Sequence, residues 1–310
     1  MISSINTINY NLSLLNKRNE KVTYQMSSEE SLQYGSDNSQ QYNKILSINN
    51  NVNSYSAILE RIKLSSSYNT NSDTAVSSMK SSMESIIGLI NEASTDTTNS
   101  DGKTTIANEI ESSKDRIYSL ANTSVDGQYL FAGKSSDIEP FVKDSTTGQI
   151  TYVATNDNKT VNVENNNYAT QGLNGLELLY YTDEATSTQV SIFDDLDEVI
   201  NALKLQDSSG NTITQEAADT ILSDALDKIQ TAYDNMNIAH AKLGTRTASI
   251  ENYKDIVQTK LTNFNILQEE YASADLTALA IESKSLESTY TALYSTINKI
   301  NNLSLVNYLN

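Results

Sequence analysis

The sequence predicts a mainly α protein with a β insertion: a long antiparallel helical bundle or coiled coil of paired N- and C-terminal segments, with a small central β domain. The strongest of three observations is a heptad stripe from Ala218 to Tyr271. Sixteen positions there alternate in steps of four and three residues, and only Arg246 and Lys260 are charged. Because such steps average about 3.5 residues, one face of a continuous helix stays turned toward a partner. In addition, the chain has a single proline, Pro140, and its pattern changes from helical to strand-like near the middle.

Two further heptad stripes lie at the ends of the chain, each with one polar position, Asn19 or Ser283. The register breaks at residues 272–275, so we expect a joint there. Narrow apolar stripes gain little without neighbours. Residues 1–40 and 276–310 are therefore expected to form a terminal coiled-coil assembly domain that becomes ordered only on assembly. Its candidate assembly and partner-binding residues are Ile5, Ile8, Leu12, Leu15, Val22, Met26, Leu276, Leu279, Leu286, Tyr290, Leu293, Ile297 and Ile300.

A helical bundle domain is predicted for residues 41–125 together with residues 192–275. In the first of these segments the heptad register meets Ser66, Asn69 and Asp73 before it becomes apolar again. This polar middle is either a local break in the helix or a place where polar groups of a partner meet the stripe.

The central residues 126–191 are predicted to form a β-rich insertion that faces outward. Runs such as 128–132 and 160–164 are separated by polar turns, for example Asp144–Gly148, which is typical of a β-meander. Residues 193–205 have the pattern of a short amphipathic helix.

Composition excludes several classes of protein. The net charge of −18 and the pI near 4.4 repel nucleic-acid phosphates, so no nucleic-acid partner is expected. The longest apolar runs are far shorter than the ~20 residues of a membrane-spanning helix, so no membrane insertion is expected. The N-terminal segment has no basic region followed by a long apolar stretch, so any export is expected to use a route without a cleavable signal peptide.

No catalytic, cofactor-binding or metal-binding residues are expected, and the protein is predicted to be neither an enzyme nor dependent on a cofactor. His240 is the single histidine and there is no cysteine, so the chain has neither an HExxH zinc site nor a Ser-His-Asp triad. We interpret His240 as a helix-surface residue. The acidic run 194–198 lacks the spacing of a calcium loop and is interpreted as a solvated helix start. Arg246 and Lys260 either extend along the bundle edge or pair with acids of a neighbouring helix or subunit.

Three stretches of the sequence match the motifs of a known family. Asn122–Gly133, followed by Pro140-Phe141, matches the pattern NT…DGxYLFAG…PF; Leu243–Arg246 matches LGxR; Leu303–Leu309 matches an LSLxxYL ending. On these motifs the chain resembles the flagellin superfamily, and within it the hook-filament junction proteins of the flagellar hook-associated protein 3 family. The signature residues are Asp126, Gly127, Tyr129, Leu130, Phe131, Ala132, Gly133, Leu243, Gly244 and Arg246.

This resemblance implies a structural component of the bacterial flagellum, a junction adaptor that connects the hook to the flagellin filament by helix–helix assembly. The implied partners are the hook-side junction protein (hook-associated protein 1), flagellin, further copies of the chain in a ring, the flagellar type III export apparatus and an export chaperone. The implied location is the extracellular flagellum. Two alternatives stay open: a flagellin, which the LSLxxYL ending disfavours, and a secreted coiled-coil adhesin or binding module that uses the β insertion.

Overall fold

The chain divides into two compact units: a terminal unit of residues 1–56 and 259–310, and a central unit of residues 57–258. The three-domain division predicted from the sequence stays a prediction. The computed structural model describes residues 2–95, 99–164, 166–183 and 186–309. Within these ranges, side chains are described for residues 6–300.

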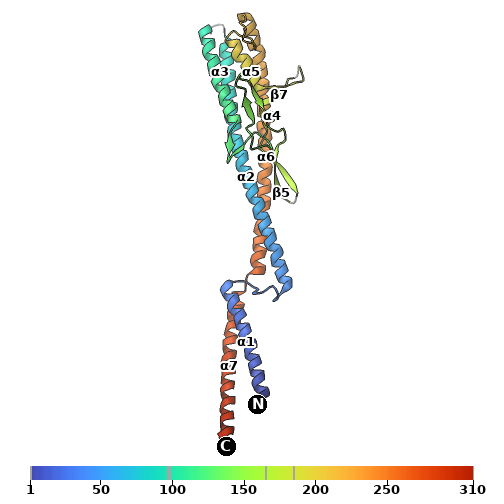
Figure 1. Cartoon of the computed structure of the whole chain (residues 1–310), viewed down its shortest axis with the longest axis vertical. Helices are drawn as coiled ribbons and strands as arrows, with labels where there is room; N and C mark the ends of the chain where they lie inside the picture. The colour runs from blue at the N-terminus through green and yellow to red at the C-terminus, as the bar shows by residue number, and fades with distance from the viewer. Residues whose placement is uncertain (1, 96–98, 165, 184–185, 310) are drawn as a thin grey trace. The chain divides into compact units, whose positions relative to one another are not determined.

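Seven helices dominate the described part of the chain, and short hairpins supply its β structure, which confirms the predicted fold class. Within the terminal unit, α1 and α7 run antiparallel, so the N-terminal end of α1 and the C-terminal end of α7 lie at the same end of the unit (Figure 1). The helices are α1 (Ile2–Ser28), α2 (Ser39–Ala93), α3 (Ser100–Ala121), α4 (Gly175–Leu179), α5 (Ile192–Leu203), α6 (Gln215–Ala272) and α7 (Leu276–Leu309).

Helix α6 contains the long stripe predicted from the sequence and is 58 residues long. The predicted joint is also present, because α6 ends at Ala272 and α7 begins at Leu276. Asp275 caps α7: its Oδ1 accepts hydrogen bonds from the backbone N–H of Thr277 at 2.9 Å and of Ala278 at 3.0 Å. The buried stripe positions of α6 are Ala218, Leu222, Ala225, Ile229, Ala232, Met236, Ala239, Leu243, Ile250 and Val257.

The polar middle of the α2 stripe does not interrupt the helix, which runs unbroken through Ser66, Asn69 and Asp73. Its polar groups meet polar groups of α6 in the same chain. Asn69 Nδ2 donates to Thr247 Oγ1 at 3.1 Å, Asp73 Oδ1 lies 2.8 Å from His240 Nε2, and the Ser66 hydroxyl donates to a glutamate of α6. The alternative of a local break in the helix is therefore wrong. The alternative that polar groups of a partner meet the stripe is correct, and the partner is α6 of the same chain.

In the part of the chain that the structure describes, the named strands form separate two-stranded antiparallel hairpins rather than the predicted β-meander. Each hairpin can use the helices instead of the next hairpin to bury its inner side chains. Phe141, for example, packs edge-on against Phe193 of α5, with ring centroids 5.7 Å apart. The paired strands are β1 (Ser124–Val125) with β2 (Gln128–Tyr129), β3 (Phe141–Lys143) with β4 (Ile150–Tyr152), β5 (Lys159–Glu164) with β6 (Asn167–Gln171), and β7 (Tyr180–Thr182) with β8 (Gln189–Ser191).

The acidic run at 194–198 begins α5 as predicted, with Ser191 as the N-cap and Asp194 and Asp195 in the first turn. The prediction that this run is solvated is wrong for Asp195, which is 3% exposed and accepts a hydrogen bond from the Tyr181 hydroxyl at 2.8 Å. The reason is that Asp195 lies on the face of α5 that packs into the core, so its carboxylate needs a buried donor.

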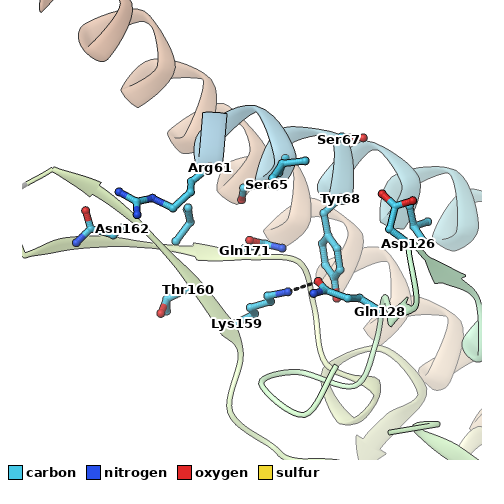
Figure 2. A pocket seen from close by; sticks show the side chains of 13 residues that line it. Arg61, Ser65, Ser67, Tyr68, Asp126, Gln128, Lys159, Thr160, Asn162 and Gln171 are labelled. Carbon is cyan, nitrogen blue, oxygen red and sulfur yellow. Dashed lines mark hydrogen bonds between the residues drawn. The ribbon is translucent and has the colours of Figure 1, made fainter. Parts of the chain in front are cut away.

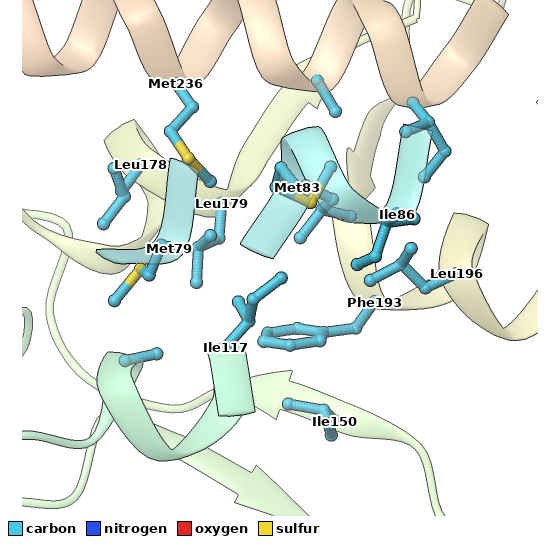
Figure 3. Close-up of a cluster of buried hydrophobic side chains, with 14 of the residues drawn as sticks. Met79, Met83, Ile86, Ile117, Ile150, Leu178, Leu179, Phe193, Leu196 and Met236 are labelled. Carbon is cyan, nitrogen blue, oxygen red and sulfur yellow. The ribbon is translucent and has the colours of Figure 1, made fainter. Parts of the chain in front are cut away.

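One hydrophobic core joins the helices of the central unit to the β insertion (Figure 3). The buried side chains come from helices and from the hairpins, so the insertion is anchored by the same core that holds the bundle. Among them are Met79, Met83 and Ile86 of α2, Ile117 of α3, Ile150 of β4, Leu178 and Leu179 of α4, Phe193 and Leu196 of α5, and Met236 of α6.

Candidate assembly surface

The inner faces of α1 and α7 pack against each other in the terminal unit. Val22 of α1 forms a small buried cluster with Leu279 and Leu286 of α7, with exposures of 3%, 8% and 4%, and Leu15 packs against it. Two polar contacts tie the same helices together: Arg18 Nε to Glu282 Oε1 at 2.7 Å, and the Tyr290 hydroxyl to Asn16 Oδ1 at 2.7 Å. The two stripes predicted at the ends of the chain therefore meet within one chain.

Most of the predicted assembly residues lie on these inner faces. Met26 and Leu276 do not, with exposures of 42% and 46%, and the side chain of Ile5 lies outside the described residues. Three inner-face residues are the buried ones named above, and the half-buried ones are Ile8, Leu12, Leu15, Tyr290, Leu293, Ile297 and Ile300. A role of these side chains in contacts with other subunits stays a prediction.

The outer faces of the same helices carry large apolar side chains that are not among the predicted assembly residues. Tyr10 and Leu14 of α1 are 70% and 56% exposed, and Ile281 and Tyr294 of α7 are 69% and 57% exposed. Tyr10 and Leu14 are four residues apart, so they share one helix face. This four-residue spacing is the signal in the sequence that could have identified the outer face, and the burial of Val22 shows that the predicted stripe is the inner one.

The family signature begins with a tight turn. Asp126 and Gly127 connect β1 to β2, and both have positive φ angles, +52° and +76°. A two-residue hairpin with two positive φ angles is the type I′ turn, for which Asp-Gly is a preferred sequence. The signature therefore starts by reversing the chain where the insertion leaves α3.

The run 130–133 of the signature lies inside the protein, whereas Gly244 is exposed on α6. Leu130, Phe131 and Ala132 are fully buried, and the Tyr68 hydroxyl of α2 donates to the carbonyl oxygens of Tyr129 at 2.9 Å and of Leu130 at 2.7 Å. This buried run anchors the insertion on the bundle.

Arg246 links α6 to the insertion through Glu177 of α4 and the carbonyl oxygen of Gly172. Of the two alternatives for this residue, pairing with an acid of a neighbouring helix is correct, because Glu177 lies in α4 of the insertion. The Nζ of Lys260 lies 5.7 Å from the centroid of the Tyr55 ring. Leu243 is buried, whereas a Cβ added at Gly244 would meet no atom within 4 Å.

Among the described helices, none combines the length and apolarity needed to cross a membrane. Within those same residues, no group of three or more acidic, histidine or cysteine side chains could hold a metal ion.

Taken together, terminal helices that pair, a helical core and a β insertion locked onto it define a mainly α fold with long paired helices and a small β insertion. No protein-family model and no curated protein matches the chain. Solved structures do match. A flagellar hook-associated protein from Vibrio parahaemolyticus is 15% identical with a TM-score of 0.66, covering 76% of this chain and 100% of that one.

Two further structures have the same fold. Flagellar hook-associated protein 3 from Legionella pneumophila is 13% identical with a TM-score of 0.64, covering 73% of this chain and 98% of that one. FlgL from Xanthomonas campestris is 18% identical with a TM-score of 0.57, covering 68% of this chain and 98% of that one. This chain therefore has the fold of the flagellar hook-associated proteins.

Proposed function

We propose that the chain is a structural subunit of the bacterial flagellum, an adaptor that joins the hook to the flagellin filament. The observation that carries this proposal is the terminal helix pair, whose outer faces expose large apolar side chains on a fold shared with hook-associated proteins. Covering one such side chain by a neighbour contributes roughly 1.5–3 kcal/mol, so a few of them can hold a subunit in an assembly. The role needs no catalysis and no cofactor.

Neighbouring subunits meet through these terminal helices. Tyr10, Leu14, Ile281 and Tyr294 supply the outer contacts, while Val22 and Leu286 hold the pair together within each subunit. The partners are a hook-side junction protein, flagellin and further copies of the chain in a ring. The subunit reaches its extracellular place through the flagellar type III export apparatus, with an export chaperone, and the β insertion faces outward.

A charge placed on the outer face tests this mechanism. Ile281→Asp leaves the subunit folded and secreted, but it places a carboxylate in the contact between subunits and prevents filament attachment. Leu286→Asp also blocks attachment, and in addition it separates α1 from α7 in the isolated chain. The matched control is Ile138→Asp, which puts the same charge at an isoleucine of the insertion that is 48% exposed. Normal filaments on cells with Ile281→Asp would contradict the mechanism.

The position of the protein on the cell tests the role itself. Gold-labelled antibody on intact flagellated cells is expected to give a narrow band where the hook meets the filament, visible by electron microscopy. Label along the whole filament would identify a flagellin instead, and label away from the flagella would favour the adhesin. Either result would overturn the junction role.

A further inference from the structure

A hollow of about 430 Å³ lies on the central unit, far along the sequence from the terminal stripes. It is bounded by α2, by the turn between β1 and β2, and by the hairpin of β5 and β6 (Figure 2). The volume is in the range of a small-molecule site. Its wall combines the apolar side chains of Leu64, Val125 and Val161 with hydroxyl, amide and charged groups.

One polar group in the wall lacks a partner. Ser65 is 3% exposed, and its Oγ forms no hydrogen bond with any residue that the structure describes. Figure 2 shows its side chain on the face of α2 that is turned toward β5 and β6. A buried hydroxyl without a partner costs free energy in the unliganded chain, and a ligand oxygen in the hollow would remove that cost.

The hollow also presents two cations. Lys159 reaches into it beside the Tyr68 ring, with its Nζ 5.3 Å from the ring centroid and 2.5 Å from Gln128 Oε1. Burial lowers the pKa of Lys159, because its ammonium loses part of its water shell. Arg61 lies toward the opposite side, near Asn162 (Figure 2). Within the described part of the chain, neither Lys159 nor Arg61 forms an ion pair, although the chain carries a net charge of −18.

The other polar side chains that line the hollow indicate which chemical groups a ligand must carry. Asp126 also lines the hollow, and its carboxylate would repel a plain anion but accepts hydrogen bonds from hydroxyl groups. Thr160, Asn162 and Gln171 add both donors and acceptors. A ligand that satisfies all these groups has one negative charge, several hydroxyls and a face of C–H groups for the apolar wall.

We propose that this hollow binds a small sugar acid, a ring that carries one carboxylate and neighbouring hydroxyl groups. The ligand carboxylate pairs with Lys159 and accepts a hydrogen bond from Ser65, and ring hydroxyls donate to Asp126. Leu64 and Val161 contact the ring face. This site does not depend on the junction role proposed above, because its residues lie outside the terminal helices.

The full-length chain, labelled with ¹⁵N, is titrated with glucuronate, galacturonate and N-acetylneuraminate, and amide shifts are followed by NMR. At least one of them is expected to give saturable shifts at the residues lining the hollow. Galactose, which lacks the carboxylate, and acetate, which lacks the ring, are each expected to bind at least tenfold more weakly. Lys159→Gln should weaken binding at least tenfold, and Ser65→Ala about three- to tenfold.

Lys134→Gln is the matched control, since Lys134 pairs with Asp157 outside the hollow and should leave binding unchanged. Ser65→Ala keeps the test decisive even if Lys159→Gln fails to fold, because it removes a single buried oxygen. The proposal is overturned if none of the three sugar acids gives saturable shifts, if Ser65→Ala binds as tightly as the native chain, or if acetate or galactose binds as tightly as the sugar acid.

Discussion

The guanidinium of Arg246 in α6 holds the carboxylate of Glu177 in α4 through two parallel hydrogen bonds, Nη1 to Oε2 at 2.8 Å and Nη2 to Oε1 at 3.0 Å. Nη1 also donates to the carbonyl oxygen of Gly172 at 2.7 Å. The paired side chains are only 18% and 23% exposed. Burial alone would raise the pKa of Glu177, but the hydrogen bonds and charge of Arg246 outweigh it and the pKa is lowered. One arginine thus fastens both the start of α4 and the end of β6 to the long helix.

Arg246→Lys tests this fastening, because lysine keeps the charge and loses the two-pronged geometry. We expect the free energy of unfolding to fall by roughly 1–3 kcal/mol. Urea titration monitored by circular dichroism measures this loss, and hydrogen exchange should quicken at the amides of α4. Lys254→Ala removes a partly exposed pair with Glu251 three residues away and should cost less than about 0.5 kcal/mol. Equal losses in the two variants would contradict the fastening role.

Gly133 is required by both its backbone and its surroundings. Its φ is +60°, and an added Cβ would lie 2.3 Å from the carbonyl oxygen of Asp157. Gly133→Ala therefore combines an unfavourable conformation with a clash against backbone, and we expect a loss of at least about 2 kcal/mol in unfolding free energy. Gly244→Ala is the matched control, because the new methyl group meets no atom and lies in helix α6. There, alanine should stabilise the isolated chain by up to about 1 kcal/mol.

Asp195 gives a pH dependence with a definite sign. Burial raises its pKa to about 6, against the opposing hydrogen bond from the Tyr181 hydroxyl. Between pH 4 and pH 6 the folded chain therefore binds more protons at this site than the unfolded chain, so unfolding free energy falls as the pH rises through this window. Asp195→Asn removes this loss, and the variant should be more stable than the native chain at pH 7 by roughly 1–3 kcal/mol.

Urea titrations of both proteins at pH 4, 5, 6 and 7 measure the difference, which should grow with pH. Asp144 provides a control of opposite sign, because hydrogen bonds from the backbone N–H of Thr147 and Thr146 lower its pKa. Its contribution to stability is present at neutral pH and is lost as the pH falls through its lowered pKa. A pH-independent difference for Asp195→Asn would show that the buried carboxylate is not the cause.

The sequence was sufficient to predict the long helix because its information is local and periodic. The stripe that begins at Ala218 needs only the repeat of the α-helix to be recognised, and its end was marked by the change of register before Leu276. The partner of Arg246 could not be predicted in this way. A heptad pattern shows that position 246 faces inward, but Glu177 lies 69 residues away in a segment without helical period.

The same limit applies to the surfaces of the terminal helices. Heptad spacing placed Val22, and not Leu14, on the predicted stripe of α1, but it did not show which helix would cover that stripe or whether Leu14 would stay uncovered. Both depend on three-dimensional packing, in which Val22 is 3% exposed against Leu286 whereas Leu14 is 56% exposed. Likewise, the turns predicted that hairpins would form. That the hairpins stay separate from one another depends on which of their side chains pack against the helices, and the turns do not show this.

Two leucine-to-alanine changes of identical chemistry separate the inner from the outer face of the terminal helices. Leu286→Ala removes a side chain buried between α1 and α7 and should destabilise that pair by roughly 2–3 kcal/mol, at the low end for a buried leucine because the cluster is small. Leu14→Ala removes an exposed side chain and should leave the isolated chain unchanged while weakening assembly. Hydrogen exchange of the monomer measures the first effect, and filament attachment measures the second.

In the Leu286→Ala monomer the amides of α1 and α7 should exchange faster, while those of α6 between residues 218 and 257 keep the rate of the native chain. The prediction that the terminal helices become ordered only on assembly gives a different result. In that case the amides of α1 would exchange equally fast in the native chain, in Leu286→Ala and in Leu14→Ala. Slow exchange in native α1 would mean that the helix pair exists before assembly. Neighbouring subunits would then recognise a preformed surface that presents Leu14, and little ordering entropy would oppose their binding.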